Sequence, residues 1–285
     1  MANLKEIRNR IASVSSTMQI TSAMKMVSAA KLKKAQDAIT AMRPYSDKLT
    51  ELIQNLSGSI DGDTPNPYTD VREVKKVLIV VITSNRGLCG GFNSSIIKSI
   101  QNEIKQQPDQ EIQLMTLGKK GHDILSKNNV VFENNNHIFD NLTYANASEL
   151  AQKCMDAFAD QVFDEVKVVY NRFKNAATQL VTTETLLPVV ADAEATQSRG
   201  DYIFEPDQEA IVNDLLPKSI KMQLFKALRD SFASEHGARM TAMHKATDNA
   251  TELRDQLKLT YNKARQAAIT NEILEIVAGA EALNG

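Results

Sequence analysis

The sequence predicts an α/β protein with a long antiparallel coiled coil of the N- and C-terminal helices and a central open α/β domain. Three observations predict it. Helix breakers cluster in the middle of the chain, both ends repeat apolar residues every three or four positions, and the middle alternates apolar with amphipathic runs. We expect an N-terminal coiled-coil helix at 1–57, the α/β domain at 58–206 and a C-terminal coiled-coil helix at 207–285.

The distribution of glycine and proline predicts the terminal helices. Leu4 to Ser57 contains no glycine and one proline, Pro44, and Lys218 to Leu283 contains no proline. In a helix interior glycine costs about 1 kcal/mol and proline about 3 kcal/mol, so such stretches favour long helices. Pro44 is expected to bend the first helix without ending it, because the apolar pattern continues to Leu56.

Both terminal segments carry a seam, meaning a line of apolar or small residues at intervals of three and four. A period of 3.5 implies left-handed supercoiling against a partner helix. The first seam breaks at Lys25 and Ser28 and then resumes, and the small residues of the second allow close approach of the axes. The first comprises Leu4, Ile7, Ile11, Val14, Met18, Thr21, Leu32, Ala35, Ile39 and Met42, and the second comprises Ile220, Leu224, Ala227, Ser231, Ser234, Ala238 and Thr241, then Ala246, Ala250, Leu253, Leu257, Tyr261, Ala264 and Ala268.

The C-terminal helix is expected to outlast its partner. At 1.5 Å per residue, helices over 3–57 and 208–285 measure roughly 80 Å and 115 Å. Antiparallel pairing places Leu4 opposite about residue 262, which leaves about 20 residues without a partner in this chain. An unpartnered apolar stripe usually marks an interface. The stripe comprises Ile269, Ile273, Ile276, Val277, Ala280 and Leu283.

The central segment alternates strands with helices, which predicts a mostly parallel sheet in an open, Rossmann-like domain. The run Gly58–Tyr68 is expected to be a loop, and Asp201–Pro206 leads into the last helix. Strands are expected at Lys76–Thr83, Glu111–Leu117, Val130–Phe132, Glu165–Phe173 and Gln179–Val189, and helices after the loop Ser84–Phe92, at Lys120–Ser126 and at Ser148–Phe163.

Composition excludes several classes of function. The 33 basic and 35 acidic residues give a net charge of −2, which provides no overall attraction to nucleic acid. The longest apolar run, Val77 to Ile82, is far shorter than the roughly 20 residues of a membrane span. Two cysteines and 4 scattered histidines supply neither a disulfide scaffold nor metal-ligand spacing. We expect no cofactor, no metal and no nucleic-acid partner.

A glycine-rich turn after the first strand favours one alternative, a nucleotide-binding enzyme. Gly87, Gly90 and Gly91 lie between a buried strand and a helix, as in dinucleotide-binding folds. The turn lacks the Gly-Lys-Ser/Thr ending of a phosphate-binding loop. The second strand ends at Leu117 and Gly118, without the acid that a dinucleotide site uses. The other explanation for these glycines is tight packing of the turn.

Positive charge is concentrated on the first helix. Residues 7–36 contain no Asp or Glu. A solvated helix face usually mixes charge signs, so a basic band that faces an acidic surface of a larger assembly is the sharper interpretation. A coiled-coil adaptor unrelated to any such assembly is a second alternative, although it does not explain the interrupting α/β domain. The band comprises Arg8, Arg10, Lys25, Lys31, Lys33 and Lys34.

Five sequence strings, in this order along this architecture, resemble one known family. Over essentially its whole length the chain resembles the gamma subunits of rotary F-type ATP synthases. Each string is moderately specific, and the ordered set is very specific. The first string is the N-terminal opening, made up of Ile7–Arg8, Ile11–Val14, Ile20–Thr21 and Ala23–Val27. The other four are Arg86–Asn93, Ala246–Ala250, Tyr261–Gln266 and the C-terminal Ile269–Ala282.

The resemblance implies a central rotor shaft that performs no catalysis itself. It would couple rotation of a membrane c-ring, driven by proton or other ion flow, to conformational changes in the catalytic beta subunits. The implied partners are the alpha and beta subunits of the head, the epsilon subunit and the c-ring. The chain has no inserted regulatory cysteine pair and no transit peptide ahead of the helix pattern, so we expect a bacterial protein, peripheral on the cytoplasmic face of the cell membrane.

The resemblance also implies contacts with the beta subunits. Arg265 and Gln266 resemble residues that catch a beta-subunit loop during rotation. Polar contacts are expected from the exposed part of the last helix, and its isoleucines would form a bearing. Near the break in the first seam, Met24 and the lysines would meet an acidic lever on beta, with coiled-coil packing as the alternative for Met24. The further contacts are Thr270, Glu272, Glu275, Lys25, Lys31, Lys33 and Lys34, and the bearing is Ile269, Ile273 and Ile276.

Overall fold

The computed structural model describes residues 4–57, 66–190 and 208–284. The predicted lead-in Asp201–Pro206, and most of the predicted loop Gly58–Tyr68, therefore lie outside the described residues. The chain forms two compact units, Met1–Ser28 with Met240–Gly285 and Ala29–Arg239, which we call the helix pair and the sandwich unit. Both boundaries lie inside helices, and the division at 57 and 206 stays a prediction.

The two long helices form as the glycine and proline distribution predicts. Helix α1 spans Leu4–Ser57 and continues through Pro44. Helix α5 spans Gln208–Asn284 and contains Pro217 near its start. Each proline removes one backbone donor, yet the flanking turns remain helical on both sides.

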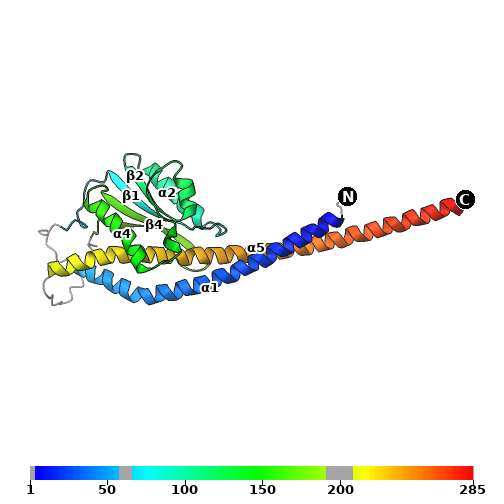
Figure 1. The fold of residues 1–285 in the computed structure, drawn as a ribbon, viewed down its shortest axis with the longest axis horizontal. Helices are drawn as coiled ribbons and strands as arrows, with labels where there is room; N and C mark the ends of the chain where they lie inside the picture. Colours follow the sequence, from blue (N-terminus) through cyan, green and yellow to red (C-terminus); the bar gives the residue numbers. More distant parts are fainter. Residues whose placement is uncertain (1–3, 58–65, 191–207, 285) are drawn as a thin grey trace. The chain divides into compact units, whose positions relative to one another are not determined.

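The sandwich unit is built on a five-stranded sheet with the order β3-β2-β1-β4-β5 (Figure 1). Strands β1 to β4 pair in parallel and β5 runs antiparallel to β4, which confirms the predicted mostly parallel sheet. The strands are β1 (Lys76–Ile82), β2 (Glu111–Leu117), β3 (Val130–Asn134), β4 (Glu165–Phe173) and β5 (Gln179–Leu187).

The short helices follow the expected alternation, with one clear difference in α4. Helix α4 begins at Tyr144, four residues before the predicted Ser148, because Thr143 caps it by accepting a hydrogen bond from the Asn146 amide at 3.3 Å. It ends at Ala159. The remaining helices are α2 (Phe92–Gln106), α3 (Lys119–Leu125) and the 3₁₀ turn η1 (His137–Phe139), which the sequence did not indicate.

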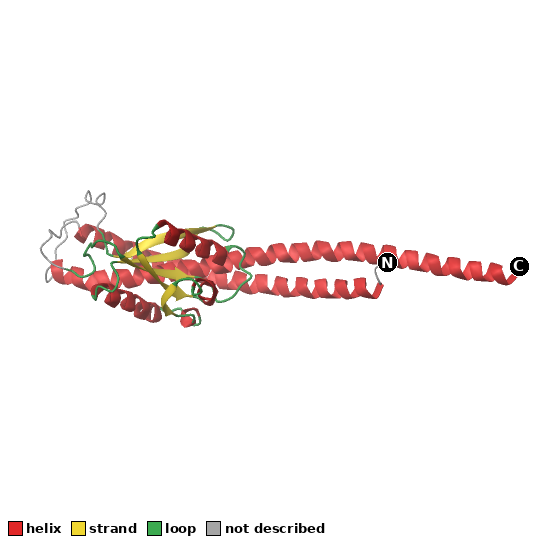
Figure 2. Cartoon of the chain, turned by 90° about the horizontal axis from the view of Figure 1, so that it is seen from above, coloured by secondary structure: helices red, strands yellow, loops and turns green. Residues whose placement is uncertain are grey.

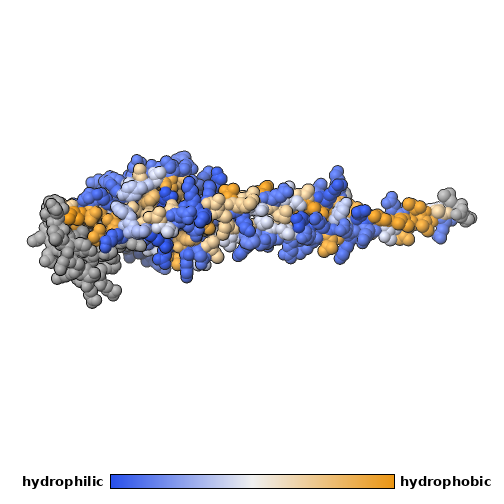
Figure 3. All heavy atoms as spheres, turned by 90° about the horizontal axis from the view of Figure 1, so that it is seen from below, coloured by the Kyte–Doolittle hydropathy of each residue, from blue (hydrophilic) through white to orange (hydrophobic). Residues whose placement is uncertain are grey.

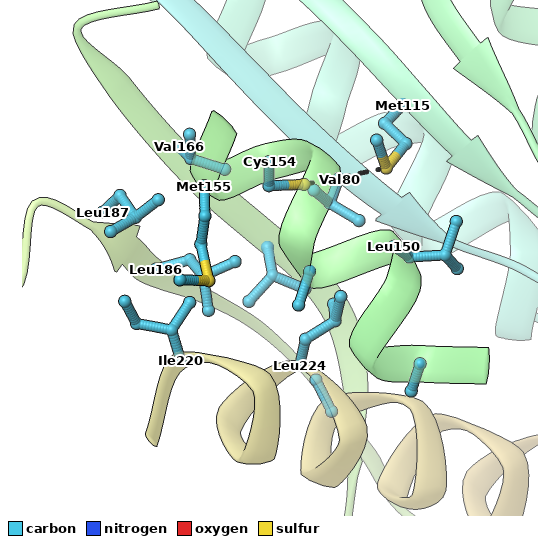
Figure 4. Close-up of a cluster of buried hydrophobic side chains, with 14 of the residues drawn as sticks. Val80, Met115, Leu150, Cys154, Met155, Val166, Leu186, Leu187, Ile220 and Leu224 are labelled. Atoms are coloured by element: carbon cyan, nitrogen blue, oxygen red, sulfur yellow. Dashed lines mark hydrogen bonds between the residues drawn. The ribbon is translucent and has the colours of Figure 1, made fainter. Parts of the chain in front are cut away.

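Strand β1 packs side chains on both faces of the sheet, as its unbroken apolar run predicts. Residues at alternate positions point to opposite faces. Leu78, Val80 and Ile82 join a core cluster with α4 and α5, part of which Figure 4 shows. Their neighbours Val77, Ile79 and Val81 join the cluster formed with α2. All six side chains are 0% exposed, so the strand is the centre of two cores.

The helix pair is antiparallel. The hydroxyl of Thr247 donates to that of Thr21 at 2.8 Å, and the guanidinium of Arg254 donates to the sulfur of Met18 at 3.5 Å. Residue numbers therefore increase along α5 where they decrease along α1. The two segments lie side by side in Figures 1 and 2. Counting 17 residues from the threonine contact places Leu4 opposite about residue 264, close to the predicted 262.

Two predicted seam positions of α5 are wrong. Leu253 is 46% exposed, and the next residue, Arg254, is half-buried against Met18 instead. The seam at this level runs through Thr247, Ala250 and Arg254 because the buried side of α5 has shifted by one position. Ala268 is exposed because it lies beyond the residue that faces Leu4.

Candidate functional site

The end of helix α5 has no partner among the described residues. Every described side chain from Arg265 to Ala282 is exposed, whereas Ala264 is still half-buried. The predicted unpartnered stripe is therefore confirmed, except that the side chain of Leu283 lies outside the described ones. Ile269, Ile273 and Ile276 are 44%, 54% and 66% exposed. Apolar side chains colour this end orange in Figure 3.

Polar side chains line the same end. Arg265, Gln266, Glu272 and Glu275 are exposed, and the hydroxyl of Thr270 donates to the Gln266 carbonyl at 3.0 Å. Residues three and four apart share a helix face, so Ile269, Ile273 and Ile276 form one stripe, with Glu272 and Glu275 next to it. This surface, which we call the α5 tip and define as residues 265–282, combines apolar area with directional donors and acceptors and is suited to binding.

The predicted basic band divides into two groups. Arg8, Arg10 and Lys25 belong to the helix pair, where the two arginines are exposed and Lys25 is half-buried. Met24, next to Lys25, is also half-buried, and the hydroxyl of Ser28 donates back to its carbonyl at 2.8 Å. Lys31, Lys33 and Lys34 belong to the sandwich unit and are exposed.

One lysine of the band has a carboxylate partner. Lys33 approaches Asp37 at 3.8 Å, and both side chains are exposed. Exposed pairs of this kind contribute at most about 1 kcal/mol and are weakened by salt. The pair therefore leaves the lysine available to a stronger acidic partner.

The glycine-rich turn between β1 and α2 is filled by the protein's own groups. Arg239 of α5 donates to the carbonyls of Arg86 at 3.0 Å and Gly87 at 3.3 Å. Ser84 donates to the Arg86 carbonyl at 2.7 Å and also contacts Asn93. These bonds hold the turn against α5. Tight packing does not explain the glycines, because a Cβ at Gly87 or Gly91 would meet no atom nearer than 3.9 Å, whereas Gly90 has a positive φ of 59° that favours glycine.

The two cysteines are buried and free. Burial raises the pKa of the Cys89 thiol, even though its hydrogen bond with Ser84 acts in the opposite direction. Burial also raises the pKa of Cys154 to about 12. A thiol with a raised pKa is a poor nucleophile at neutral pH, so both cysteines act as packing residues.

A buried charged cluster on α5 was not predicted. Glu235 pairs with Arg239, and both are nearly buried in the sandwich unit. Burial lowers the pKa of neighbouring His236 to about 3, with Arg239 and Lys31 acting in the same direction. The available signal was the spacing of Glu235 and Arg239, four residues apart among the small residues of a buried seam.

The described residues contain neither a membrane-spanning helix nor a cluster of metal ligands. No described helix combines the length and hydropathy needed to cross a bilayer. The described part of the chain also brings together no group of 3 or more His, Cys, Asp or Glu side chains that could hold a metal ion. The α5 tip and the basic band remain the described surfaces best suited to binding.

Comparisons with known proteins agree with the fold. A family model described as ATP synthase matches residues 3–283. The chain is 66% identical to the ATP synthase gamma chain of Flavobacterium johnsoniae and 65% identical to that of Flavobacterium psychrophilum, with 100% of each chain covered.

Solved structures give the same result. A chain from the central stalk and c-ring of Tetrahymena thermophila mitochondrial ATP synthase matches with a TM-score of 0.62 and 28% identity, over 80% of this chain and 99% of that one. A chain of Euglena gracilis mitochondrial ATP synthase, at 22% identity and a TM-score of 0.70, covers 98% of this chain and 94% of that one and supports the fold.

The chain therefore belongs to the ATP synthase family. Its function is that of the gamma subunit, a non-catalytic component of the central stalk and rotor of an F-type ATP synthase. It is part of a membrane-associated complex for ATP synthesis and ion transport. Family membership sets aside both alternatives, the nucleotide-binding enzyme and the unrelated adaptor.

Proposed function

We propose that this chain is the rotating shaft of a bacterial enzyme, peripheral on the cytoplasmic face of the cell membrane. Its partners are the alpha and beta subunits of the head, the epsilon subunit and the c-ring. The observation that carries the proposal is the α5 tip, whose described side chains from Arg265 to Ala282 are all exposed. An apolar stripe of this extent is suited to a surrounding protein surface.

The isoleucines of the α5 tip act as a bearing. Burial of apolar area is non-directional and proportional to area, so it changes little as the helix turns. Ile269, Ile273 and Ile276 can exchange one apolar surface for another around the rotation, with no hydrogen bond to break. Their exposure in the chain alone, between 44% and 66%, supports this role.

The polar side chains provide contacts that depend on angle. Charge-assisted hydrogen bonds are short and directional. Arg265 and Gln266 lie at the first exposed turn beyond the helix pair, and we assign them the catch on a beta-subunit loop. Thr270, Glu272 and Glu275 make further polar contacts with the surrounding subunits.

The basic band provides a longer-range contact. Lys25, Lys31, Lys33 and Lys34 would face an acidic lever of beta, and Met24 would pack beside them. Such contacts between exposed charges are screened over about 8 Å at physiological ionic strength. Their contribution is therefore expected to fall as salt rises.

Coupling requires the shaft to bind three beta conformations unequally. A ligand shifts an equilibrium only by its differential affinity for the two states. Moving a two-state equilibrium from 1:99 to 99:1 takes about 5.5 kcal/mol of differential binding. Directional contacts at the α5 tip and the basic band supply this bias, and the bearing leaves the rotation itself unhindered.

Deletion of residues 269–285 in the assembled complex tests the proposal. We expect the complex to assemble, because the helix pair and sandwich unit keep their buried contacts, and to lose a large part of ATP synthesis and ATP-driven proton pumping. The matched control replaces Ile269, Ile273 and Ile276 by leucine, which preserves the apolar area and should retain most of the activity. Unchanged synthesis and pumping after deletion would contradict the role of the tip.

The basic band is tested separately by charge reversal. Lys31→Glu with Lys34→Glu should lower turnover and remove part of its salt dependence, because the reversed charges repel an acidic lever. The control is Lys258→Glu with Lys263→Glu, which reverses two exposed charges elsewhere. Equal turnover in the Lys31/Lys34 variant and the unmodified complex would count against the band.

A further inference from the structure

A cleft of about 560 Å³ opens in the sandwich unit where three elements meet. Helix α1 contributes Ile39, Met42, Arg43 and Ser46, the β4–β5 hairpin contributes one wall, and α5 contributes another. Small-molecule sites usually measure about 300–1,000 Å³ and combine apolar walls with a few polar groups. The cleft has both the size and the mixed lining of such a site.

Positive charge dominates the lining. Arg43 of α1, Arg172 of β4, Lys174 of the hairpin and Lys226 of α5 all line the cleft, against a single carboxylate, Asp230. Within the described residues, none of the four cations forms a salt bridge with a carboxylate. Four cations from three elements therefore converge on one concave surface without neutralisation by direct pairing.

Asp230 lies at the buried side of the cleft and does not neutralise it. It is 6% exposed, and burial raises the pKa of its carboxyl to about 6. Lys226 of α5, Arg43 of α1 and Arg172 of β4 lower that pKa, and Glu184 of β5 raises it. Even with Asp230 fully ionised, the lining keeps an excess of three positive charges, counted as four cations less one carboxylate.

The remaining lining is apolar. Ile39 and Met42 of α1, with Phe173 and Leu180 of the β4–β5 hairpin, line the cleft together with the charged groups. Arginine guanidinium groups bind phosphate oxygens with two parallel hydrogen bonds, and lysine adds compact positive charge. A compact anion with several charges satisfies four cations in a concave site better than carboxylates spaced along a peptide.

We propose that this cleft binds a phosphate-bearing anion, either free phosphate or pyrophosphate or the phosphate groups of a nucleotide. Arg43 of α1 and Arg172 of β4 hold the phosphate oxygens, and Lys174 and Lys226 add positive charge. Apolar and charged side chains line the same cleft, so a nucleotide base would lie against Met42 and Phe173. The site is distinct from the glycine-rich turn, whose carbonyls are already bonded by Arg239 and Ser84.

Calorimetric titration of the full chain tests the proposal. The probes are inorganic phosphate, pyrophosphate and ADP, at about 0.15 M salt so that weak surface attraction is screened. We expect saturable binding of pyrophosphate or ADP at one site per chain. Tighter binding of ADP than of pyrophosphate would assign a nucleotide, and equal or weaker binding of ADP would assign a free phosphate compound.

Two variants and a control locate the site. Arg43→Gln with Arg172→Gln should weaken binding about tenfold or more, since two charge-assisted contacts are lost. Asp230→Asn removes the opposing carboxylate and should strengthen binding several-fold, a gain that misfolding cannot produce. Lys258→Gln with Lys263→Gln removes two exposed cations outside the cleft and should leave binding unchanged.

Several results would overturn the proposal. These are no saturable binding of any probe, an equal loss in the Lys258/Lys263 control, and no strengthening in Asp230→Asn. Binding of a glutamate-rich peptide as tight as that of pyrophosphate would show that the cleft takes an acidic protein segment instead. Circular dichroism of every variant checks that the chain remains folded.

Discussion

The sandwich unit and the helix pair place the same residue type in opposite environments. Ile79 in β1 is 0% exposed and packs in the cluster beneath α2, whereas Ile276 of the α5 tip is 66% exposed. Burial of such a side chain stabilises a fold by about 1.5–3 kcal/mol. The difference teaches that the sandwich unit buries its apolar side chains in its own core, while the α5 tip leaves them exposed, as the proposed bearing requires.

The largest expected change in stability comes from truncating a buried isoleucine of the sandwich unit. Ile79→Ala should destabilise the chain by about 4 kcal/mol, because it removes buried methylenes and leaves a cavity in a rigid strand. Urea unfolding followed by circular dichroism measures the change. A loss below about 1 kcal/mol would mean that β1 is not the centre of two cores.

Arg239→Gln should have the next largest effect. The change leaves Glu235 buried without its partner, removes the Arg239 donor from the Gly87 carbonyl, and leaves the Arg86 carbonyl with the bond from Ser84 but without that from Arg239. Breaking a buried pair in this way costs about 3 kcal/mol. The double variant Glu235→Gln with Arg239→Gln should recover part of that loss, as measured by the same urea titration. If neither variant changed the free energy of unfolding, the buried pair would contribute little to stability.

His236 should make the sandwich unit sensitive to acid. The pKa of its buried imidazole is lowered to about 3, below the ordinary value of 6.5, so the unfolded chain binds the proton more readily. Stability is therefore full above pH 6.5 and falls as the pH drops toward about 3, by at most about 1.4 kcal/mol per pH unit.

Unfolding measured at pH 7 and pH 5 checks this dependence. His236→Leu, which cannot titrate, should show a smaller loss of stability than the unmodified chain over that interval. Equal losses would indicate that other groups control the acid response.

Ile276→Ala should have the smallest effect on stability. A side chain on an exposed surface changes the free energy of unfolding by less than about 0.5 kcal/mol. Combined with Ile269→Ala and Ile273→Ala in the assembled complex, it should still lower ATP synthesis. Normal synthesis in the triple variant, at unchanged stability, would show that the tip needs no apolar bearing.

Much of this architecture follows from short-range patterns. The absence of breakers between Leu4 and Ser57 predicted α1, and the unbroken run Val77–Ile82 predicted a strand buried on both faces. The overhang followed from helix lengths alone. These features depend on local propensity and periodicity, which a single sequence displays directly.

Features that depend on contacts between distant residues were not predictable. The shift of the α5 seam at Leu253 arises from the particular fit of Arg254 against Met18 in α1. The bonds from Arg239 to the glycine-rich turn join residues 153 and 152 positions apart. The cleft around Asp230 similarly gathers cations from three elements that no sequence spacing relates.

The most direct test is carbodiimide labelling of carboxylates at the α5 tip. In the chain alone, Glu272 and Glu275 are exposed and should label as readily as Glu149 on α4. In the assembled complex, Glu272 and Glu275 should be protected relative to the chain alone, because we propose that the surrounding subunits enclose the tip. Equal labelling of Glu272 and Glu275 in the chain and in the complex would show that the tip remains in solvent and would contradict its role as the contact with the head.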